Sequence, residues 1–215
     1  MSTSTTAGSN PKTERIREFI FHFFLLFMSA IVNGWLRALG NPALLISTTT
    51  KLLKASKPLN IPIYITTQNR ARLGATVSEF DAYLDPANVR ADLDKTLFSM
   101  VTPELKSCFP EQPLDAIIVG IESHICVTQT TLDLLAMGHR VYIVADGVSS
   151  VNPEERVVAL ARLRDAGAIV TTSESLLFEI MGDAKHSMFK QVSGLVKETG
   201  DETKRALGAF CGSKI

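Results

Sequence analysis

The chain has 215 residues, 46% of them hydrophobic, which is enough for one well-buried domain of ordinary size. Lys and Arg together number 22, as do Asp and Glu, so the formal net charge is zero and nothing electrostatic favours nucleic acid as a partner. Three cysteines, Cys108, Cys126 and Cys211, form neither a paired framework nor a metal spacing. We therefore expect a reducing compartment and a cytoplasmic protein.

Two different segments precede the first regular pattern. Residues 1–18 are rich in Ser, Thr, Gly and Asn, and we expect a disordered tail there. Residues 19–40 form an apolar segment of uncertain role, with the most apolar run of the chain at 19–32. That run is short for a membrane span unless residues up to 39 extend it. Membrane contact through 19–39, or a mitochondrial location, is an alternative that we do not favour; a packing helix and a gene-model artefact are the other interpretations.

Strand and helix patterns alternate from residue 41 onward, which predicts one domain over residues 41–199. We expect residues 41–46 to open the first strand and to run directly into a helix that ends at Lys57. Residues 61–67 alternate and carry β-branched side chains, as in a strand. The stretch 68–86 resembles a long surface connection of the kind that often carries substrate contacts.

The remaining elements complete an α/β pattern. Further strands are expected at 96–99, 116–119, 140–145 and 168–172, and further helices at 103–108, 153–166, 174–181 and 186–197. Such alternation predicts a three-layer αβα fold, with a mostly parallel sheet of about five or six strands covered by helices on both faces. Residues 200–215 show no strong period, and we expect a C-terminal tail.

Cys126 lies where a strand ends and a helix begins. The strand is the apolar run 116–119, and the helix carries an apolar stripe that stops at Gly138. Backbone N–H groups and the helix dipole at such a place favour a thiolate, which is a good nucleophile. The alternative is a small buried hydrophobe, because free cysteines are often fully buried.

The motif Gly-Ile-Glu-Ser-His-Ile-Cys-Val at residues 120–127 resembles the nucleophile segment of the isochorismatase-like cysteine hydrolases, closest to the eukaryotic isochorismatase domain-containing proteins. Residues 94–100, 144–150 and 168–174 match further family segments in order and spacing. The resemblance covers residues 41–198 and implies a Rossmann-like αβα fold. It also implies a small-molecule substrate and assembly into dimers or larger rings.

The resemblance implies a specific catalytic arrangement. Cys126 would be the nucleophile, Lys95 its charged partner, and an Asp would move the proton. The backbone N–H groups of Glu122 and Cys126 would hold an oxyanion, and the peptide bond between Ile121 and Glu122 would be cis. Without the resemblance, Lys95 would be predicted as an exposed lysine, the usual fate of that residue type.

Other polar residues have two interpretations each. His124 and Gln68 are candidates for the pocket, but His124 equally suits a helix cap. Glu122 suits a hydrogen-bonded structural role better than an acid catalyst. Asp146 follows a predicted strand and would anchor a loop.

The Asp of the family lies at the end of its first strand, and this chain contains neither Asp nor Glu from Phe19 to Ser78. We therefore expect the segment that carries it to be absent after Ile46. Asp92 and Asp94 lie near Lys95, but adjacent strand residues point to opposite faces. The sequence thus predicts an impaired hydrolase acting on an amide or related bond, or a pseudoenzyme that binds without turnover.

Neither a metal nor a cofactor is expected. Nicotinamidases in the resembled family bind a divalent ion through an Asp-x-His pattern after the second strand, where this chain has Thr67-Gln68-Asn69-Arg70. We expect a homo-oligomer, because an exposed apolar run such as 19–32 exceeds what a monomer normally leaves in water.

Overall fold

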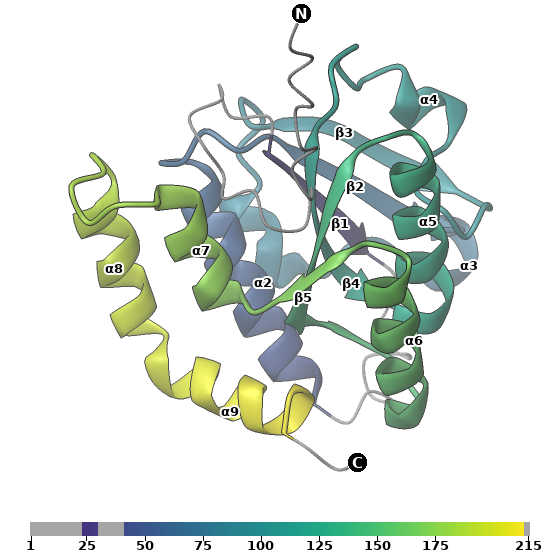
Figure 1. Ribbon diagram of the computed structural model, residues 1–215. Coiled ribbons are helices and arrows are strands. Elements are labelled where there is room, and N and C mark those ends of the chain that lie inside the picture. The colour runs from purple at the N-terminus through teal and green to yellow at the C-terminus, as the bar shows by residue number, and fades with distance from the viewer. Residues whose placement is uncertain (1–22, 30–40, 213–215) are drawn as a thin grey trace, which may run out of the picture.

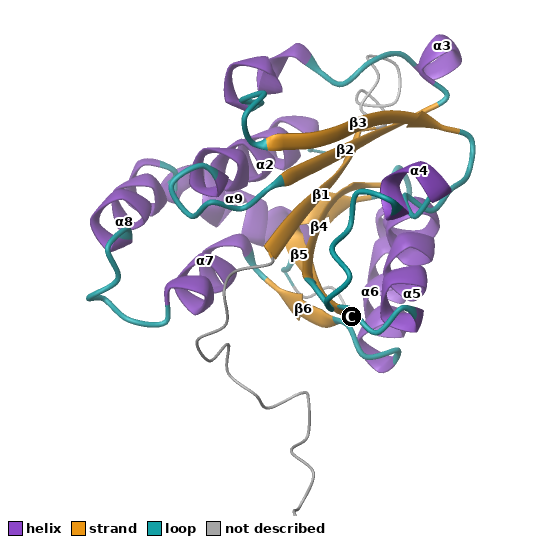
Figure 2. Ribbon diagram, turned by 90° about the horizontal axis from the view of Figure 1, so that it is seen from above, coloured by secondary structure: helices purple, strands orange, loops and turns teal. Residues whose placement is uncertain are grey.

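The computed structural model describes residues 23–29 and 41–212, which form a parallel sheet with helices on both faces (Figures 1 and 2). The strands are β1 Phe23–Ser29, β2 Ile63–Gln68, β3 Val89–Lys95, β4 Asp115–Ile121, β5 Arg140–Ser149 and β6 Ile169–Thr171. Their order in the sheet is β3-β2-β1-β4-β5-β6, and every pair is parallel. The predicted three-layer αβα fold with about five or six strands is therefore confirmed, and the sheet has six strands.

The helical elements cover this sheet. They are α2 Pro42–Ser56, α3 Arg70–Leu73, η1 Ser78–Tyr83, α4 Pro103–Lys106, η2 Ser123–Val127, α5 Thr128–Ala136, α6 Pro153–Asp165, α7 Ser173–Met181, α8 Phe189–Glu198 and α9 Gly200–Phe210. Within the described residues, no helix is long and apolar enough to cross a membrane.

Strand β1 comes from the apolar run at 19–32 and lies in the middle of the sheet. Leu25 pairs with Ile63 of β2 on one side and with Ile117 of β4 on the other. A parallel strand covered on both faces is expected to be continuously apolar. The separation of residues 19–40 from the domain is therefore wrong for 23–29. These seven residues are not part of a free apolar segment, on which our expectation of an oligomer rested. The interpretations given to 1–18 and to the rest of 19–40 lie outside the described residues.

The prediction of a first strand at 41–46 is also wrong, because these residues begin helix α2. Pro42 occupies the first helical position, where its missing N–H is no loss, and Asn41 precedes it as the N-cap. Leu45 and Leu53 are buried on the face of α2 toward the sheet. The helix is continuous through Ile46, so no segment is missing at that point.

Alternate residues of β4 enter two separate hydrophobic cores. Val119 and Ile121 belong to the core under α2, α7 and α9. Ile118 belongs to the core under α5 and α6, which includes Leu134 and Leu163. The period of two along a buried strand produces this division.

Residues 200–210, predicted as part of a tail, form helix α9 instead. Phe210 is 9% exposed, and the Arg156 guanidinium lies over its ring at 5.6 Å and donates to its carbonyl. Lys51 Nζ, buried in α2, donates to Thr203 Oγ1 at 2.8 Å. Helix α9 thus completes the helical layer on one face of the sheet. Several of its residues are charged, and its few buried residues gave no clear helical period in the sequence.

Two smaller expectations also changed. The strand expected at 96–99 lies earlier, as β3, and 96–99 form a bend after it. The connection expected over 68–86 contains the short helices α3 and η1.

We predict that Phe210→Ala lowers the free energy of unfolding by about 2–4 kcal/mol, because it removes a buried ring and its contact with Arg156. Denaturant unfolding followed by circular dichroism measures the change. Lys204→Ala, at an exposed position of the same helix, is the control and should have almost no effect. Equal stability of both variants would show that α9 is not part of the folded unit.

Candidate active site

The candidate site lies at the carboxyl ends of the central strands. The strand order reverses between β1 and β4, and ligands of open α/β sheets bind beside such a switch point. Strand β4 ends at Ile121, the Ile121–Glu122 peptide bond is cis, and the π-helical turn η2 follows with Cys126 in it. The chain therefore turns sharply from β4 into α5, and Cys126 lies at that turn.

Cys126 is buried, with 7% of its surface exposed. Burial raises the pKa of its thiol, while the charge of Lys95 and the backbone N–H of Glu122 act in the opposite direction. We expected the strand-to-helix position to favour the thiolate. That expectation is wrong in net direction, because removal of the sulfur from water outweighs the two favourable contacts.

Lys95, the last residue of β3, is also buried, with 6% exposed. Its Nζ donates to Gln68 Oε1 at 2.6 Å, to the Leu97 carbonyl at 2.8 Å and to the Phe98 carbonyl at 3.0 Å. An ammonium has three donors, so these three neutral oxygens occupy all of them. Burial lowers the pKa of Lys95, and the negative charges of Cys126 and Asp94 raise it. Lys95 and Cys126 are therefore electrostatic partners.

The two nearby aspartates bind Arg70 rather than Lys95. Asp92 Oδ1 accepts from Arg70 Nη2 at 2.5 Å, and Asp94 Oδ1 accepts from the Arg70 backbone N–H at 2.8 Å and from Thr67 Oγ1 at 3.0 Å. The two hydrogen bonds to Asp94 lower the pKa of its carboxyl, and the one from the Arg70 backbone N–H has the largest effect. Neither Asp92 nor Asp94 forms a hydrogen bond with the Lys95 ammonium, so neither takes the place of the catalytic Asp of the family.

Gln68 ends β2 and contacts Lys95, whereas Thr67 contacts Asp94 and Asn69 adopts a left-handed backbone conformation. In the part of the chain that the structure describes, no three His, Cys, Asp or Glu side chains form a group able to hold a metal ion.

A polar network lies beside the turn after β4. Glu122 Oε2 accepts from the Val151 N–H at 2.9 Å and lies 3.8 Å from His124 Nδ1. The same Nδ1 lies 3.2 Å from Ser150 Oγ, which accepts from the Ser123 N–H. A Ser-His-acid triad needs both ring nitrogens, one for each partner, so this network is not one. Sequence reasoning missed Ser150, although it belongs to the matching segment 144–150.

Glu122 has one carboxylate oxygen without a partner. Oε1 is buried and has no hydrogen bond from any described residue, and the same holds for Ser123 Oγ. Burial raises the pKa of Glu122, opposed by the Val151 N–H and by His124. Glu122 thus has the structural contacts that we expected, and it also faces Cys126 closely enough to raise the pKa of the thiol by its charge.

Asp146 lies within β5 and holds the start of α7. Its Oδ1 accepts from the Ser173 N–H at 2.7 Å, and its Oδ2 accepts from the Ser173 hydroxyl. Asp146 is fully buried, so its role is to anchor a helix rather than a loop.

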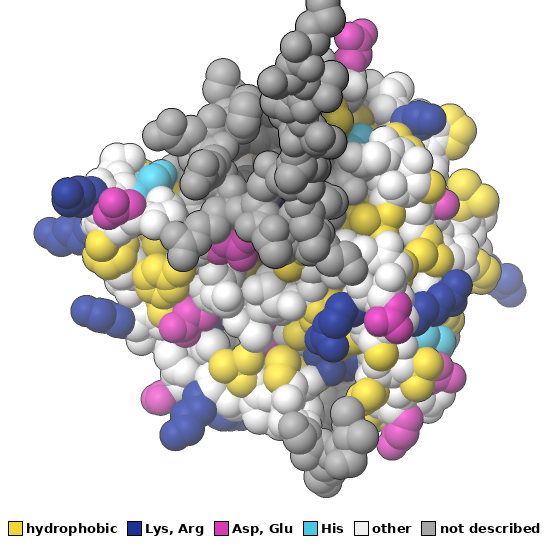
Figure 3. All heavy atoms as spheres, viewed as in Figure 1, with side chains coloured by type: hydrophobic (Ala, Val, Ile, Leu, Met, Phe, Trp, Pro, Cys, Tyr) yellow, Lys and Arg dark blue, Asp and Glu magenta, His cyan; other side chains and the backbone are white. Residues whose placement is uncertain are grey.

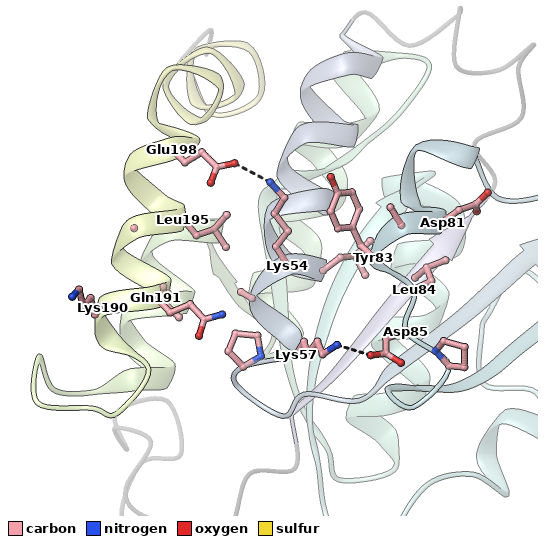
Figure 4. Close-up of a pocket in the computed structure, with 17 residues that line it drawn as sticks. Lys54, Lys57, Asp81, Tyr83, Leu84, Asp85, Lys190, Gln191, Leu195 and Glu198 are labelled. Atoms are coloured by element: carbon pink, nitrogen blue, oxygen red, sulfur yellow. Dashed lines mark hydrogen bonds and ion pairs between the residues drawn. The ribbon is translucent and has the colours of Figure 1, made fainter.

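A groove of about 830 Å³ lies apart from the Cys126 site, between the end of α2, η1 and α8 (Figure 4). Two ion pairs cross or border it, Lys54–Glu198 at 2.9 Å and Lys57–Asp85 at 2.8 Å. Lys54 and Lys57 are thus each paired with a carboxylate, and none of the predicted catalytic residues lines the groove.

We predict that Cys126 reacts with iodoacetamide at least about tenfold more slowly than the exposed Cys108 at pH 7, because Cys126 is buried and its thiol pKa is raised. Lys95→Met should slow Cys126 further, since the pKa loses its main opposing charge. Rates mapped by mass spectrometry between pH 6 and about 10 test both claims. Lys106→Met is the control; a faster Cys126 in Lys95→Met would contradict the assignment of Lys95.

The chain matches known proteins along most of its length. The Isochorismatase domain model matches residues 25–175, from β1 to α7. The secreted isochorismatase effector Isc1 of Phytophthora sojae is 37% identical over 196 residues, which cover 89% of this chain and 93% of that protein. Isochorismatase domain-containing protein 1 of Salmo salar is 39% identical over 161 residues, which cover 74% of this chain but only 56% of that protein.

Among solved structures, the MAR1 ribonuclease of Caenorhabditis elegans superposes with a TM-score of 0.76 and 35% identity, covering 82% of this chain and 90% of that one. The family model includes the segments that carry Gln68, Lys95 and Cys126. Because that model matches most of the chain and the relatives are well above 30% identical, the chain belongs to the isochorismatase family.

Proposed function

We propose that this protein is a cysteine-dependent hydrolase that acts slowly on an amide or related bond in a small molecule. The observation that supports it best is the pair of buried residues at the carboxyl ends of β3 and β4, in which the charge of Lys95 acts on the thiol of Cys126. A buried cation beside a buried thiol stabilises a thiolate when a substrate carbonyl arrives.

The chemistry would proceed by acyl transfer to sulfur. Cys126 Sγ forms a bond to the carbonyl carbon, the carbon–nitrogen bond breaks, and the amine leaves with the proton that the thiol gave up. Water then hydrolyses the thioester and restores the thiol. The backbone N–H of Glu122 lowers the pKa of the Cys126 thiol through a hydrogen bond, and we assign this N–H and that of Cys126 as the oxyanion donors on the strength of the family resemblance. Oxyanion donors of this kind contribute most when they are fixed in advance.

Slow turnover follows from the missing proton carrier. Between Phe19 and Ser78, the part of the chain that contains β1 and its connection to β2, there is neither Asp nor Glu. A positioned general base or acid contributes roughly 10²–10⁴ in rate. Lys95 is a poor replacement, because transfer of its proton would remove the charge that stabilises the thiolate.

The second candidate is a protein that binds a small molecule without turnover. The contacts of Lys95 favour it: its three donors are already bound to the oxygens of Gln68, Leu97 and Phe98, so none is left to exchange a proton with substrate. Both candidates use the positive charge of Lys95, which acts on Cys126.

Ribonuclease activity, after which the similar Caenorhabditis elegans protein is named, is not our proposal for this chain. RNA binding relies on Lys and Arg contacts to phosphates, and the net charge here is zero. On the face drawn in Figure 3, basic and acidic side chains are interspersed. A short single-stranded RNA among the test substrates decides this alternative by experiment.

A homo-oligomer and a cytoplasmic location remain part of the proposal. Leu97 and Phe98, next to Lys95, are 54% and 51% exposed, which is unusual for neighbouring large apolar residues beside a site. All three cysteines are free thiols, as suits a reducing compartment.

For activity, we predict that the unmodified chain hydrolyses amide substrates at least about a hundredfold more slowly than a relative that keeps a strand-one Asp. Ser29→Asp and Ala30→Asp introduce a carboxylate at the last residue of β1 and at the next residue of the sequence. One of them should raise kcat/KM by about tenfold or more.

The measurement is kcat/KM on one panel of amides, esters and a short single-stranded RNA. Cys126→Ser in each background is the control and should abolish hydrolysis. An unmodified chain as fast as the Asp-containing relative would show that another residue moves the proton. Cleavage of RNA that survives Cys126→Ser would overturn the cysteine-dependent proposal.

For assembly, we predict a dimer or larger oligomer that dissociates when Phe98→Asp places a charge in its exposed apolar pair. Light scattering at several concentrations measures the mass. Lys204→Glu changes charge at an exposed site on α9 and should leave the mass unchanged. A monomeric unmodified chain would contradict the prediction.

A further inference from the structure

Gln68 and Lys95 are placed side by side by the sheet itself. They are the last residues of β2 and β3, and they pair directly in the parallel register. Neighbouring strands lie about 4.8 Å apart, and residues in register point to the same face. The two side chains therefore meet because of the strand pairing, without any special loop.

The orientation of the Gln68 amide is fixed by a third residue. Its Nε2 donates to the Thr96 carbonyl at 2.8 Å, and its Oε1 accepts from Lys95 Nζ at 2.6 Å. The Thr96 carbonyl can only accept a hydrogen bond, so the NH2 group of Gln68 must point toward it. The amide oxygen of Gln68 then points toward the Lys95 ammonium, which can only donate. Both contacts agree on one amide orientation.

The other two acceptors of Lys95 belong to the chain that follows it. The bend 96–100 brings the carbonyls of Leu97 and Phe98 to Lys95 Nζ. The end of this bend is held by α5, because the Met100 N–H donates to Thr130 Oγ1 at 2.9 Å. Of the three acceptors of the ammonium, only Gln68 belongs to another strand. It determines where along the sheet the charge lies.

Gln68 is neutral, and this matters for the charge. A carboxylate in its place would form an ion pair with Lys95 and cancel most of its field at Cys126. An amide satisfies the same hydrogen bond without adding a negative charge, so that, among the described residues, Cys126 and the more distant Asp94 are the negative groups that act on Lys95. Such an arrangement directs the field of a buried cation at its remaining partner, the sulfur.

We propose that Gln68 is a positioning residue that fixes the Lys95 ammonium beside Cys126 without neutralising it. The proposal rests on the proposed function only in taking Cys126 as the reactive group. It deepens that function by identifying a neutral residue, rather than an acid, as the partner that makes Lys95 act on the thiol.

The test follows the titration of the thiol rather than turnover. In Gln68→Glu the new carboxylate pairs with Lys95, and alkylation of Cys126 by iodoacetamide at pH 7 should slow by about tenfold. This corresponds to an upward shift of about one pH unit in the pH dependence of the alkylation rate. Gln68→Met keeps the length, removes the hydrogen bond and should slow alkylation too. Gln191→Glu makes the same charge change at an exposed position of α8 and should leave the profile unchanged.

A double-mutant cycle separates positioning from general damage. If Gln68 acts through Lys95, Gln68→Met should have no further effect on the profile in a Lys95→Met background. Additive effects, or an unchanged profile in Gln68→Glu and Gln68→Met, would overturn the proposal. Circular dichroism excludes variants that do not fold. Absence of hydrolysis in the unmodified chain would overturn the proposed function but leave this titration result intact.

Discussion

The sheet depends on β1, because it is the strand that joins the two halves. Hydrogen bonds along one edge of β1 hold β2 and thereby β3, and those along the other edge hold β4, β5 and β6. The parts of the candidate site are divided between these halves: Lys95 ends β3, and Cys126 follows β4. The register of β1 against both neighbours therefore helps to fix how the end of β3 lies relative to the end of β4.

The site itself reflects a competition between burial and charge. Lys95 and Cys126 each lose solvation, which favours the uncharged form of both, and each is the charge that favours ionisation of the other. Removing the field of Lys95 would leave the thiol with the Glu122 N–H as its remaining favourable contact, and removing that of Cys126 would leave the ammonium with the charge of Asp94. The neutral acceptors around Lys95 keep the ammonium hydrogen-bonded, so it tolerates burial without a carboxylate.

The sequence predicted the fold class and the place of Cys126, but it located the N-terminal part incorrectly, for physical reasons. A central parallel strand is apolar on both faces, so residues 23–29 share their composition with a membrane segment and carry no alternation. Pro42 and the apolar residues after it suit a strand as well as the first turn of α2. Helix α9 was missed because only a few of its residues, such as Ala206, are buried.

The candidate site was predictable in part. Lys95 and Cys126 came from the family motif, while their burial and the raised pKa of the thiol depend on packing that no local pattern contains. The contact between Lys95 and Gln68 follows from the register of β2 with β3, which joins residues 27 positions apart in the sequence. Interpretation of local sequence windows cannot supply such a pairing.

The shell around Lys95 also explains why hydrolysis and simple binding are difficult to separate in this chain. A carboxylate next to an ammonium does two things: it balances the charge and it carries a proton. Gln68 does neither and only fixes the position of Nζ. The ammonium therefore retains its charge for whatever negative group lies near Cys126, a thiolate in a hydrolase or an anionic ligand in a binding protein. Both proposed functions need the same buried cation, and a hydrolase needs a proton carrier in addition.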